Sequence, residues 1–471
     1  MSLRDVVTIT SEALVQARLS PLRQRLHPAS AVSQDSVRHD NIVLAVPYNR
    51  NGAQKPVKRC KSSNFGMACD YTASGLTLAF AASDLPQFTN NHYSVGDPQH
   101  RVEDDAFLPY WMDARCSAPS VRNANTIVHR RLHMRVTEAL LAGPLGFGTA
   151  PLGNMYRDIP EDEALATVDA AWDAGTRFFD TAPFYGAGLA EIRLGKALLK
   201  RPRSEYVLSS KVGRLILDEI EDPGGREHGE KGEIFKHGRP NKIIPDYSAD
   251  GTVKSIEDSL ERMKVDHLDF VWVHDIAQDF YGDRWLAMFE TARTGAFRAL
   301  SKLRDQGLIK GWGLGVNKVE PVELLLGLAE ADPDATSLAG RYTLLDHELA
   351  LQRLMPAAQR KKVDIVIGGP YSSGVLAGGH HFEYGAVPPA IAAKVEKISD
   401  LCADYKIPIK AAALQFSLAH PASAAVIPGA SKPERISEDH AALKTNIPAD
   451  FWYALRKERP CGRTGAAADR S

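Results

Sequence analysis

The chain has 471 residues, with 57 lysines and arginines against 58 aspartates and glutamates, so its formal net charge is −1. This balance gives no large field that would attract nucleic acid or an anionic membrane, and we expect neither as a partner. The length exceeds a usual domain of roughly 100 to 200 residues and fits one large domain with an appendage. A small neutral or weakly charged ligand is the simpler expectation.

Cysteine usage and hydropathy point to a cytoplasmic protein. The five cysteines are sparse and lack the spacing of metal ligands or of a disulfide framework, which fits a reducing compartment and predicts no metal site. No stretch approaches the roughly 18 consecutive apolar residues of a spanning helix. Residues 1–40 leave an organelle transit peptide open, because five arginines lie among Ser and Ala there, although Asp5, Glu12 and Asp35 argue against it.

Residues 1–135 contain short apolar runs interrupted by polar, Gly-rich and Pro-rich stretches, and no period of 2 or 3.6 persists. We predict a largely disordered N-terminal extension, with a small separate module as the alternative. The pattern changes near Gly143, so residues 136–460 are predicted to form the main domain. Residues 461–471 are predicted to be a flexible C-terminal tail.

Within the main domain, short β-branched or aromatic runs alternate with amphipathic stretches, which is typical of a parallel α/β fold. The predicted strands cover residues 144–150, 176–182, 206–212, 268–274, 311–316, 337–342, 364–369 and 424–429. The predicted helices cover residues 161–174, 189–200, 252–263, 296–306, 320–329, 348–359, 390–405 and 410–419. Eight strand–helix units favour a closed (β/α)8 TIM barrel, because an open doubly wound sheet usually has about five or six strands.

One connection is too long for an ordinary loop of such a barrel. Residues 214–247, between the third and fourth strands, are rich in Glu, Gly, Lys and Pro. We expect this segment to cover the substrate.

Active sites of these barrels lie at the carboxyl ends of the strands, where four polar residues stand out. Asp180 ends the second strand and Tyr185 follows it, Lys211 ends the third strand, and His274 ends the fourth. Each alone is more often a turn, packing or solvated residue. Together, on adjacent strands, they indicate one catalytic patch.

These residue types suit the reduction of a carbonyl group. Hydride arriving at the carbon leaves negative charge on oxygen, so the site must supply a proton and hydrogen-bond donors. A tyrosine can give the proton, but its ordinary pKa of about 10 makes it reluctant. We expect Lys211 to lower the pKa of Tyr185, Asp180 to keep Lys211 charged, and His274 to orient the carbonyl oxygen.

Motifs from Leu145 to Arg456, among them RFFDTAPFYGAGLAEIRLGKAL, LSSKVGRL, DFVWVHDI, GGPYSSGVLAGG and AAVIPGASKPERI, resemble the aldo-keto reductase family. Within that family they resemble the group of D-threo-aldose 1-dehydrogenase, L-fucose dehydrogenase and pyridoxal 4-dehydrogenase. The resemblance implies that Asp180, Tyr185, Lys211 and His274 form a catalytic tetrad, with Tyr185 as the proton donor or acceptor.

The same resemblance implies a nicotinamide cofactor. Asn317 would bind the carboxamide, Tyr371 would stack on the nicotinamide ring, and residues 372–376 would line the pyrophosphate. The implied cofactor residues are Gly148, Thr149, Asn317, Tyr371, Ser372, Gly374, Leu376, Gly429, Ser431 and Arg435. The Gly-rich runs GPLGFG and GGP do not fit a Rossmann fingerprint, because neither opens a helix with the required glycine spacing.

Departures from the family pattern bear on the choice of nucleotide. Many relatives that use NADP have a lysine where this chain has Gly429 and a serine where it has Ala430. We therefore expect NAD, with NADP as an alternative because Arg435 can pair with a phosphate. Asn317–Lys318 and Ala339 also replace a Ser-Asn pair and a glutamine, as in the sugar-dehydrogenase group.

The sequence thus predicts an NAD(P)-dependent dehydrogenase that moves hydride between nicotinamide and C1 of an aldose, or acts on a comparable alcohol or aldehyde such as pyridoxal. The competing hypothesis is a nucleotide-binding regulatory protein on the same fold, resembling potassium-channel beta subunits. The complete tetrad favours catalysis.

Overall fold

The structure, a computed structural model, describes residues 134–223 and 234–457 together with two short strands near residue 70. Strands β1 (Asp70–Thr72) and β2 (Gly75–Thr77) pair antiparallel with each other. They belong to a unit of residues 32–126, whereas residues 1–31 and 127–471 form the other unit. Residues 1–40, for which a transit peptide was left open, the predicted C-terminal tail and nearly all of the predicted extension lie outside the described residues.

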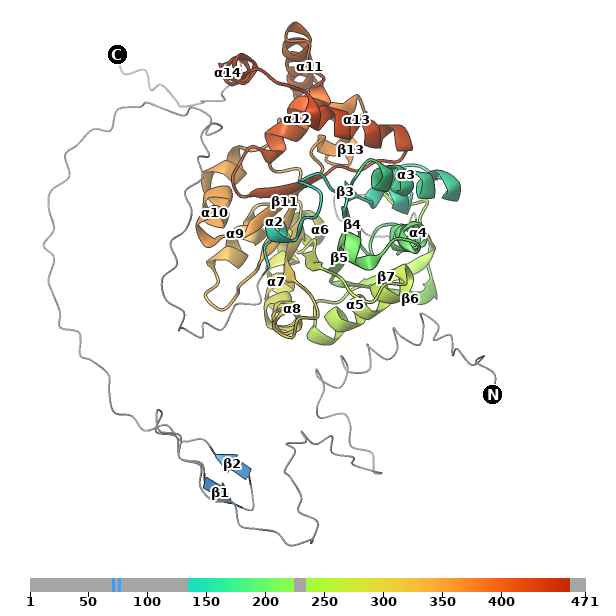
Figure 1. Cartoon of the computed structure of the whole chain (residues 1–471), viewed down its shortest axis with the longest axis vertical. Coiled ribbons are helices and arrows are strands. Elements are labelled where there is room, and N and C mark those ends of the chain that lie inside the picture. Colours follow the sequence, from blue (N-terminus) through green and yellow to red (C-terminus); the bar gives the residue numbers. More distant parts are fainter. Residues whose placement is uncertain (1–69, 73–74, 78–133, 224–233, 458–471) are drawn as a thin grey trace, which may run out of the picture. The chain divides into compact units, whose positions relative to one another are not determined.

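Eight parallel strands form the barrel (Figure 1). They are β3 (Phe147–Gly148), β4 (Phe178–Asp180), β5 (Val207–Val212), β8 (Phe270–His274), β9 (Gly311–Val316), β10 (Ala335–Ala339), β11 (Asp364–Gly368) and β14 (Ser423–Ile427). Isolated bridges from Leu145 to Val426 and from Gly148 to Gly429 join the first strand to the last. The prediction of a closed (β/α)8 barrel is confirmed.

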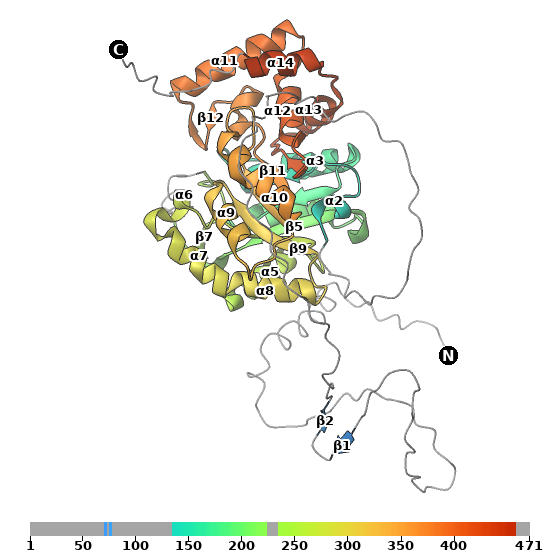
Figure 2. The ribbon, with the colours of Figure 1, turned by 90° about the vertical axis from the view of Figure 1, so that its left-hand side faces the viewer.

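Helices surround the strands, as the two ribbon views show (Figures 1 and 2). Those that were predicted are α3 (Glu161–Asp173), α4 (Leu189–Leu198), α5 (Ala249–Met263), α8 (Ala296–Asp305), α9 (Glu320–Gly327), α10 (Met355–Lys361), α11 (Pro389–Asp404) and α12 (Ile409–Leu418). Helix α3 has Pro160 before it and three acidic residues in its first turn, and Gly175 follows it at φ +100°. Helix α10 is shorter than predicted because residues 350–354 form a π-helical turn.

Further helices were not predicted. They are α2 (Val136–Ala139), α6 (Gln278–Tyr281), α7 (Trp285–Thr294), α13 (Pro433–Lys444) and α14 (Ala449–Lys457). Helix α2 packs against β11 and β14, and its side chains join the hydrophobic cluster of Phe178, Phe270 and Trp272. Arg135 pairs with Asp364 at the start of β11, and Thr137 bonds to the same carboxylate. Helix α2 therefore seals the amino-terminal end of the barrel, opposite the predicted active site.

The long connection after β5 is more ordered than predicted. β6 (Arg214–Ile220) and β7 (Asn241–Pro245) pair as an antiparallel hairpin, with Leu215 opposite Ile244 and Ile216 opposite Ile243. β-branched and apolar residues in both strands favour this pairing. A second small hairpin, β12 (His381–Phe382) with β13 (Gly385–Ala386), follows β11.

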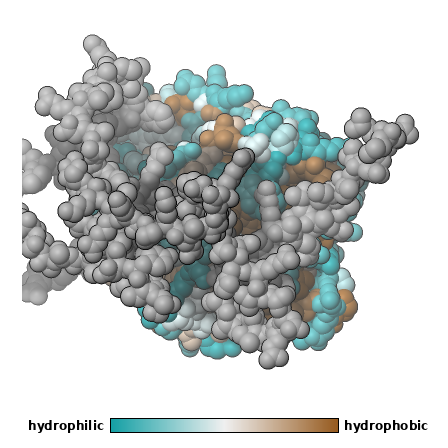
Figure 3. Space-filling model, turned by 60° about the horizontal axis from the view of Figure 1, so that its bottom comes forward, coloured by the Kyte–Doolittle hydropathy of each residue, from teal (hydrophilic) through white to brown (hydrophobic). Residues whose placement is uncertain are grey.

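Large apolar side chains are exposed at several places on the described surface. Large exposed hydrophobic residues come from different elements, namely Leu141, Leu199, Ile220, Leu286, Leu324, Leu349 and Tyr453. On the face in Figure 3, the hydrophobic areas lie between hydrophilic ones. Scattered apolar residues of this kind are normal for a protein surface. No helix in the described ranges is long and apolar enough to cross a membrane.

Candidate active site

Asp180 and Lys211 form a buried ion pair at the carboxyl ends of the neighbouring strands β4 and β5. Lys211 Nζ lies 2.6 Å from Asp180 Oδ2 and donates to the Thr181 carbonyl oxygen at 2.9 Å. Both side chains are almost completely buried. A buried charge is tolerated when it is paired and hydrogen-bonded, and this pair meets both conditions.

The Asp180 carboxylate is held by two further donors. Its Oδ1 atom accepts hydrogen bonds from Ser209 Oγ at 2.6 Å and from Trp272 Nε1 at 2.9 Å. The glycines of β9 leave room for these large side chains, since a Cβ at Gly315 would lie 3.0 Å from Trp272 Cβ and 3.4 Å from Lys211 Cε. Gly315 thus leaves room for Trp272, whose indole holds Asp180.

Tyr185 lies in the turn between β4 and α4. Its ring centroid is 4.8 Å from Lys211 Nζ and 5.8 Å from the His274 ring, which meets it edge to face at 83°. The backbone at Tyr185 packs so closely on Gly153 that a Cβ there would come within 2.5 Å of Tyr185 C. The structure therefore brings together all four polar residues that the sequence singled out.

The pKa of Tyr185 moves opposite to the expected direction. Burial raises it well above the ordinary value, the negative charges of Asp180 and Asp275 raise it further, and Arg214 lowers it. The net shift is the reverse of the expected one, because burial and the charges of Asp180 and Asp275 outweigh the nearby positive charge. The phenol is consequently protonated at neutral pH, and the raised pKa makes it a weaker acid than a free tyrosine.

His274 is held as a neutral imidazole. Burial lowers its pKa well below the ordinary value, and the positive charges of Arg214 and Lys211 lower it further. Tyr247 fixes the backbone at this point, because its hydroxyl donates to the His274 carbonyl oxygen at 2.6 Å. A neutral imidazole can donate one hydrogen bond into the pocket and keeps the other nitrogen as an acceptor.

The lowered pKa of His274 predicts a loss of stability in mild acid. Below the ordinary pKa the unfolded chain binds a proton that the folded chain does not, so the free energy of unfolding falls as pH falls from about 7 to 5. One such group contributes at most about 1.4 kcal/mol per pH unit. When the free energy of unfolding, measured with urea, is plotted against pH across this range, the slope should be shallower for His274→Gln than for the unchanged protein. Equal slopes would contradict the assignment.

Arg214 and Asp275 form an ion pair beside the four predicted residues. Neither member of the pair was predicted from the sequence. Arg214 NH1 lies 2.9 Å from Asp275 Oδ2, and His274 Nε2 lies 3.3 Å from the same oxygen. Asp275 directly follows the strand-ending His274, so the rule that found His274 could have found it too. Arg214 had no comparable signal, because it lies in the segment that was expected to be a loop.

One pocket of about 480 Å³ adjoins all four predicted catalytic residues and extends toward α13. Seven of the ten implied cofactor residues line it: Gly148, Asn317, Tyr371, Gly374, Gly429, Ser431 and Arg435. Thr149, Ser372 and Leu376 do not line it. They are buried behind the wall, where Thr149 bonds to the Asp180 carbonyl oxygen and Ser372 to Thr343.

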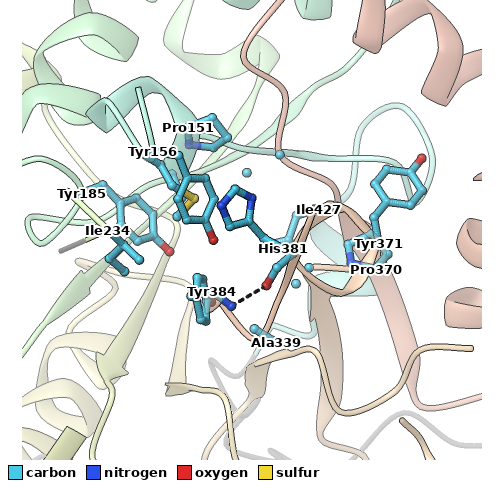
Figure 4. A pocket seen from close by; sticks show the side chains of 18 of the residues that line it. Pro151, Tyr156, Tyr185, Ile234, Ala339, Pro370, Tyr371, His381, Tyr384 and Ile427 are labelled. Atoms are coloured by element: carbon cyan, nitrogen blue, oxygen red, sulfur yellow. Dashed lines mark hydrogen bonds between the residues drawn. The ribbon is translucent and has the colours of Figure 1, made fainter. Parts of the chain in front are cut away.

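Asn317 and Tyr371 are each fixed by neighbours. Asn317 Nδ2 donates to Asp279 Oδ2 at 3.3 Å, and its Oδ1 accepts from the Tyr384 hydroxyl at 3.3 Å. The Tyr371 hydroxyl donates to Asp439 Oδ1 at 2.6 Å. Burial, together with that carboxylate, raises the pKa of Tyr371. In Figure 4 the Tyr371 ring lies apart from Tyr185 and is directed away from it.

Aromatic side chains from distant segments also line the pocket. The rings of Tyr156 and His381 stack at 4.1 Å and 9°, joining the loop after β3 to the β12–β13 hairpin (Figure 4). Tyr384 lies below them, and its backbone N–H donates to Ser373 Oγ at 3.1 Å. Burial raises the pKa of Tyr156 to about 12. Nothing in the sequence pattern pairs these loops.

A closed barrel whose strand ends carry buried polar side chains around one pocket has the form of a barrel enzyme. The sequence model of the Aldo/keto reductase family matches residues 144–458, and the chain belongs to this family of oxidoreductases. Pyridoxal 4-dehydrogenase of Microbacterium luteolum is 37% identical over 69% of this chain and 99% of its own length. D-threo-aldose 1-dehydrogenase of a Pseudomonas species is 34% identical over 67% of this chain and 93% of its own length.

Solved structures show the same fold. The holo form of the aldo-keto reductase AKR11C1 from Bacillus halodurans superimposes with a TM-score of 0.52 at 22% identity, covering 67% of this chain and 91% of that one. The resemblance of the sequence motifs to this family is confirmed by the family match and by both dehydrogenases.

Proposed function

We propose that this protein is an NAD(P)-dependent dehydrogenase that moves hydride between nicotinamide and C1 of an aldose, or a similar alcohol or aldehyde such as pyridoxal. The observation that carries the proposal is the convergence of Asp180, Lys211, Tyr185 and His274 on one wall of the long pocket. We assign these four side chains to catalysis and the barrel of residues 136–460 to the catalytic domain.

The part of the pocket lined by Gly374, Gly378 and Arg435 fits an anionic dinucleotide. Gly374 and Gly378 have φ values of +102° and +78°, and a Cβ at either would meet no atom within 4 Å, so the backbone borders open space. Ser431 and Arg435 line the pocket as well. Open glycine backbone suits phosphate groups. Asn317 would hold the carboxamide, and a bound nicotinamide would supply or accept the hydride.

The chain's own residues would handle the proton. In the reducing direction, the Tyr185 hydroxyl, which is protonated at neutral pH, donates its proton to the carbonyl oxygen as the arriving hydride makes that oxygen basic. The neutral His274 donates a hydrogen bond to the same oxygen. Lys211, fixed by Asp180, stabilises the phenolate that remains. In the oxidising direction the phenolate would take the proton back, so oxidation should be favoured by high pH.

The substrate end of the pocket suits a compact polar molecule with an apolar face. Phe184, Phe235, Phe280 and Ile234 line it beside Tyr185. Aromatic walls accept the C–H face of a sugar or a flat heterocycle, while His274 and Tyr185 bind its polar edge. The names of the two similar dehydrogenases, for pyridoxal and for D-threo-aldoses, agree with this lining.

A substrate screen tests the proposal directly. Purified protein is mixed with NAD or NADP and with L-fucose, D-arabinose or pyridoxal, and the absorbance of reduced nicotinamide is followed. The reverse reaction is tested with aldehydes. We expect turnover of at least one sugar or of pyridoxal. Tight nucleotide binding with no turnover across the panel would contradict catalysis and favour the regulatory, channel-subunit-like alternative.

Arg435 provides a test of the nucleotide preference. If Arg435 pairs with the extra phosphate of NADP, Arg435→Ala should weaken NADP binding by about 10-fold or more, because a charge-assisted bond contributes about 1.5–3 kcal/mol. NAD affinity should change little. The Kd of each nucleotide is measured by quenching of tryptophan fluorescence, with Arg353→Ala, on the exposed surface, as the control. Equal weakening of both nucleotides would contradict a phosphate-specific role.

A further inference from the structure

The Arg214–Asp275 ion pair lies next to the proposed catalytic residues and has no part in the proton transfer described above. Both side chains are buried, with Arg214 NH1 2.9 Å from Asp275 Oδ2. The two members face different surroundings, since Asp275 lines the pocket and Arg214 lies behind its wall. The Arg214 guanidinium covers the rings of Phe184 at 4.3 Å and Phe280 at 5.0 Å. Asp275 therefore borders the pocket, and its counter-charge lies outside.

The backbone holds Asp275 in an uncommon conformation. Its φ of +53° is in the left-handed region, which aspartate adopts more readily than most residues but which is still rare outside glycine. The Asp275 N–H donates to the Gly315 carbonyl oxygen at 2.9 Å, and the Ala277 N–H donates to the Asp275 carbonyl oxygen at 2.8 Å. Uncommon backbone conformations that neighbours enforce gather at functional sites. Here the conformation places a carboxylate beside the end of β8.

The distance between Asp275 and His274 limits what the carboxylate can bind. Asp275 Oδ2 is 3.3 Å from His274 Nε2, and His274 is the residue assigned to the reacting oxygen. A group that binds both the imidazole and the carboxylate must therefore carry its second polar atom within one or two carbons of the reacting carbon. An ionised carboxylate accepts hydrogen bonds and donates none, so that second atom must belong to a donor such as a hydroxyl.

We propose that Asp275 determines substrate specificity by accepting a hydrogen bond from a substrate hydroxyl within two carbons of the reacting carbon, with Arg214 as its positioning partner. The proposal rests on the proposed function. An aldose carries such a hydroxyl on the carbon next to C1, and the neutral tautomer of pyridoxal carries one on the ring carbon next to that bearing the aldehyde. Asp275 thus explains how one pocket could serve both kinds of substrate that the relatives' names describe.

The test compares matched substrates with and without the hydroxyl. D-arabinose is compared with 2-deoxy-D-ribose, which lacks only its C2 hydroxyl, and pyridoxal is compared with 3-deoxypyridoxal. For whichever parent compound the unchanged enzyme turns over, we expect a kcat/KM preference of about 10- to 150-fold over the analogue, as for a hydrogen bond to a charged group. Asp275→Asn should reduce that preference about tenfold, because a neutral amide oxygen is a weaker acceptor.

Two further variants separate recognition from folding. Arg214→Met with Asp275→Leu removes both charges together, which avoids leaving a buried charge unpaired, and should abolish the preference for the hydroxylated compound. Asp334→Asn breaks another buried ion pair, with Arg304 at 3.2 Å and outside the pocket, and should leave the preference unchanged. Melting temperatures confirm that each variant is folded.

The outcomes are distinguishable. An unchanged preference in folded Asp275→Asn and in the double variant, or no preference in the unchanged enzyme, overturns the role of Asp275 and leaves the proposed function intact. If Asp275→Asn does not fold, the double variant decides. Failure of the unchanged enzyme to turn over any of the four compounds, L-fucose or the aldehydes of the screen overturns the proposed function and the role of Asp275 with it.

Discussion

Tyr185→Phe is expected to lower kcat by about 10²- to 10⁴-fold, the usual contribution of a positioned acid or base. The substitution removes the proton and keeps the ring, which packs at 5.7 Å against Phe235 and at 5.8 Å against His274. The pocket should keep its shape, so the Kd of the nucleotide should change little. Steady-state kinetics and nucleotide titration on the same preparation measure both quantities.

A matched control separates the catalytic hydroxyl from a structural one. Tyr206→Phe removes the hydroxyl of another buried tyrosine, which lies outside the pocket, and should leave kcat close to that of the unchanged enzyme. If Tyr185→Phe kept full turnover, another group would have to supply the proton, and the assignment of the tetrad would be wrong. Equal losses in both variants would indicate a general effect on folding.

Lys211→Met is expected to lower the free energy of unfolding by about 3–5 kcal/mol, because it leaves the Asp180 carboxylate buried without its counter-charge. Adding Asp180→Asn to Lys211→Met should recover part of the loss, since the orphaned charge is then removed. Urea unfolding at neutral pH measures each variant. The diagnostic quantity is the increase in the free energy of unfolding when Asp180→Asn is added to Lys211→Met. If Lys211→Met only removed packing contacts, the second substitution would lower the free energy of unfolding further.

Lys196 supplies a comparison at the same distance. Lys196 Nζ lies 2.6 Å from Glu161 Oε1, as Lys211 Nζ does from Asp180 Oδ2, but about half of each side chain is exposed. Exposed pairs contribute about 0–1 kcal/mol, so Lys196→Met should have a small effect. A similar loss for Lys196→Met and Lys211→Met would contradict the view that burial makes the Asp180–Lys211 pair important.

The sequence predicted the barrel well because its strands are short apolar runs whose order and number leave few alternatives. The same property made the active-site candidates recognisable, since Asp180, Lys211 and His274 each end such a run. The β6–β7 hairpin was missed because Gly, Glu and Lys dominate the segment between its strands. Helix α13 was missed because the residues that begin it were assigned to a phosphate site.

Interactions between distant loops could not be predicted. The Tyr156–His381 stack and the Tyr371–Asp439 hydrogen bond join segments whose separation in space depends on how the whole barrel closes. The direction of the Tyr185 pKa shift was wrong for a related reason. Residue types suggested a lysine near a phenol, but burial and the charges of Asp180 and Asp275 decide the direction of the shift.

The central claim is that Tyr185 and His274 bind the reacting oxygen beside a nicotinamide held in the same pocket. An experimental structure of the enzyme with nucleotide and an unreactive carbonyl compound tests it most directly. We predict that the carbonyl oxygen lies about 2.6–3.2 Å from both the Tyr185 hydroxyl and a His274 ring nitrogen. A nucleotide bound outside this pocket, or a carbonyl oxygen turned away from both side chains, would contradict the claim.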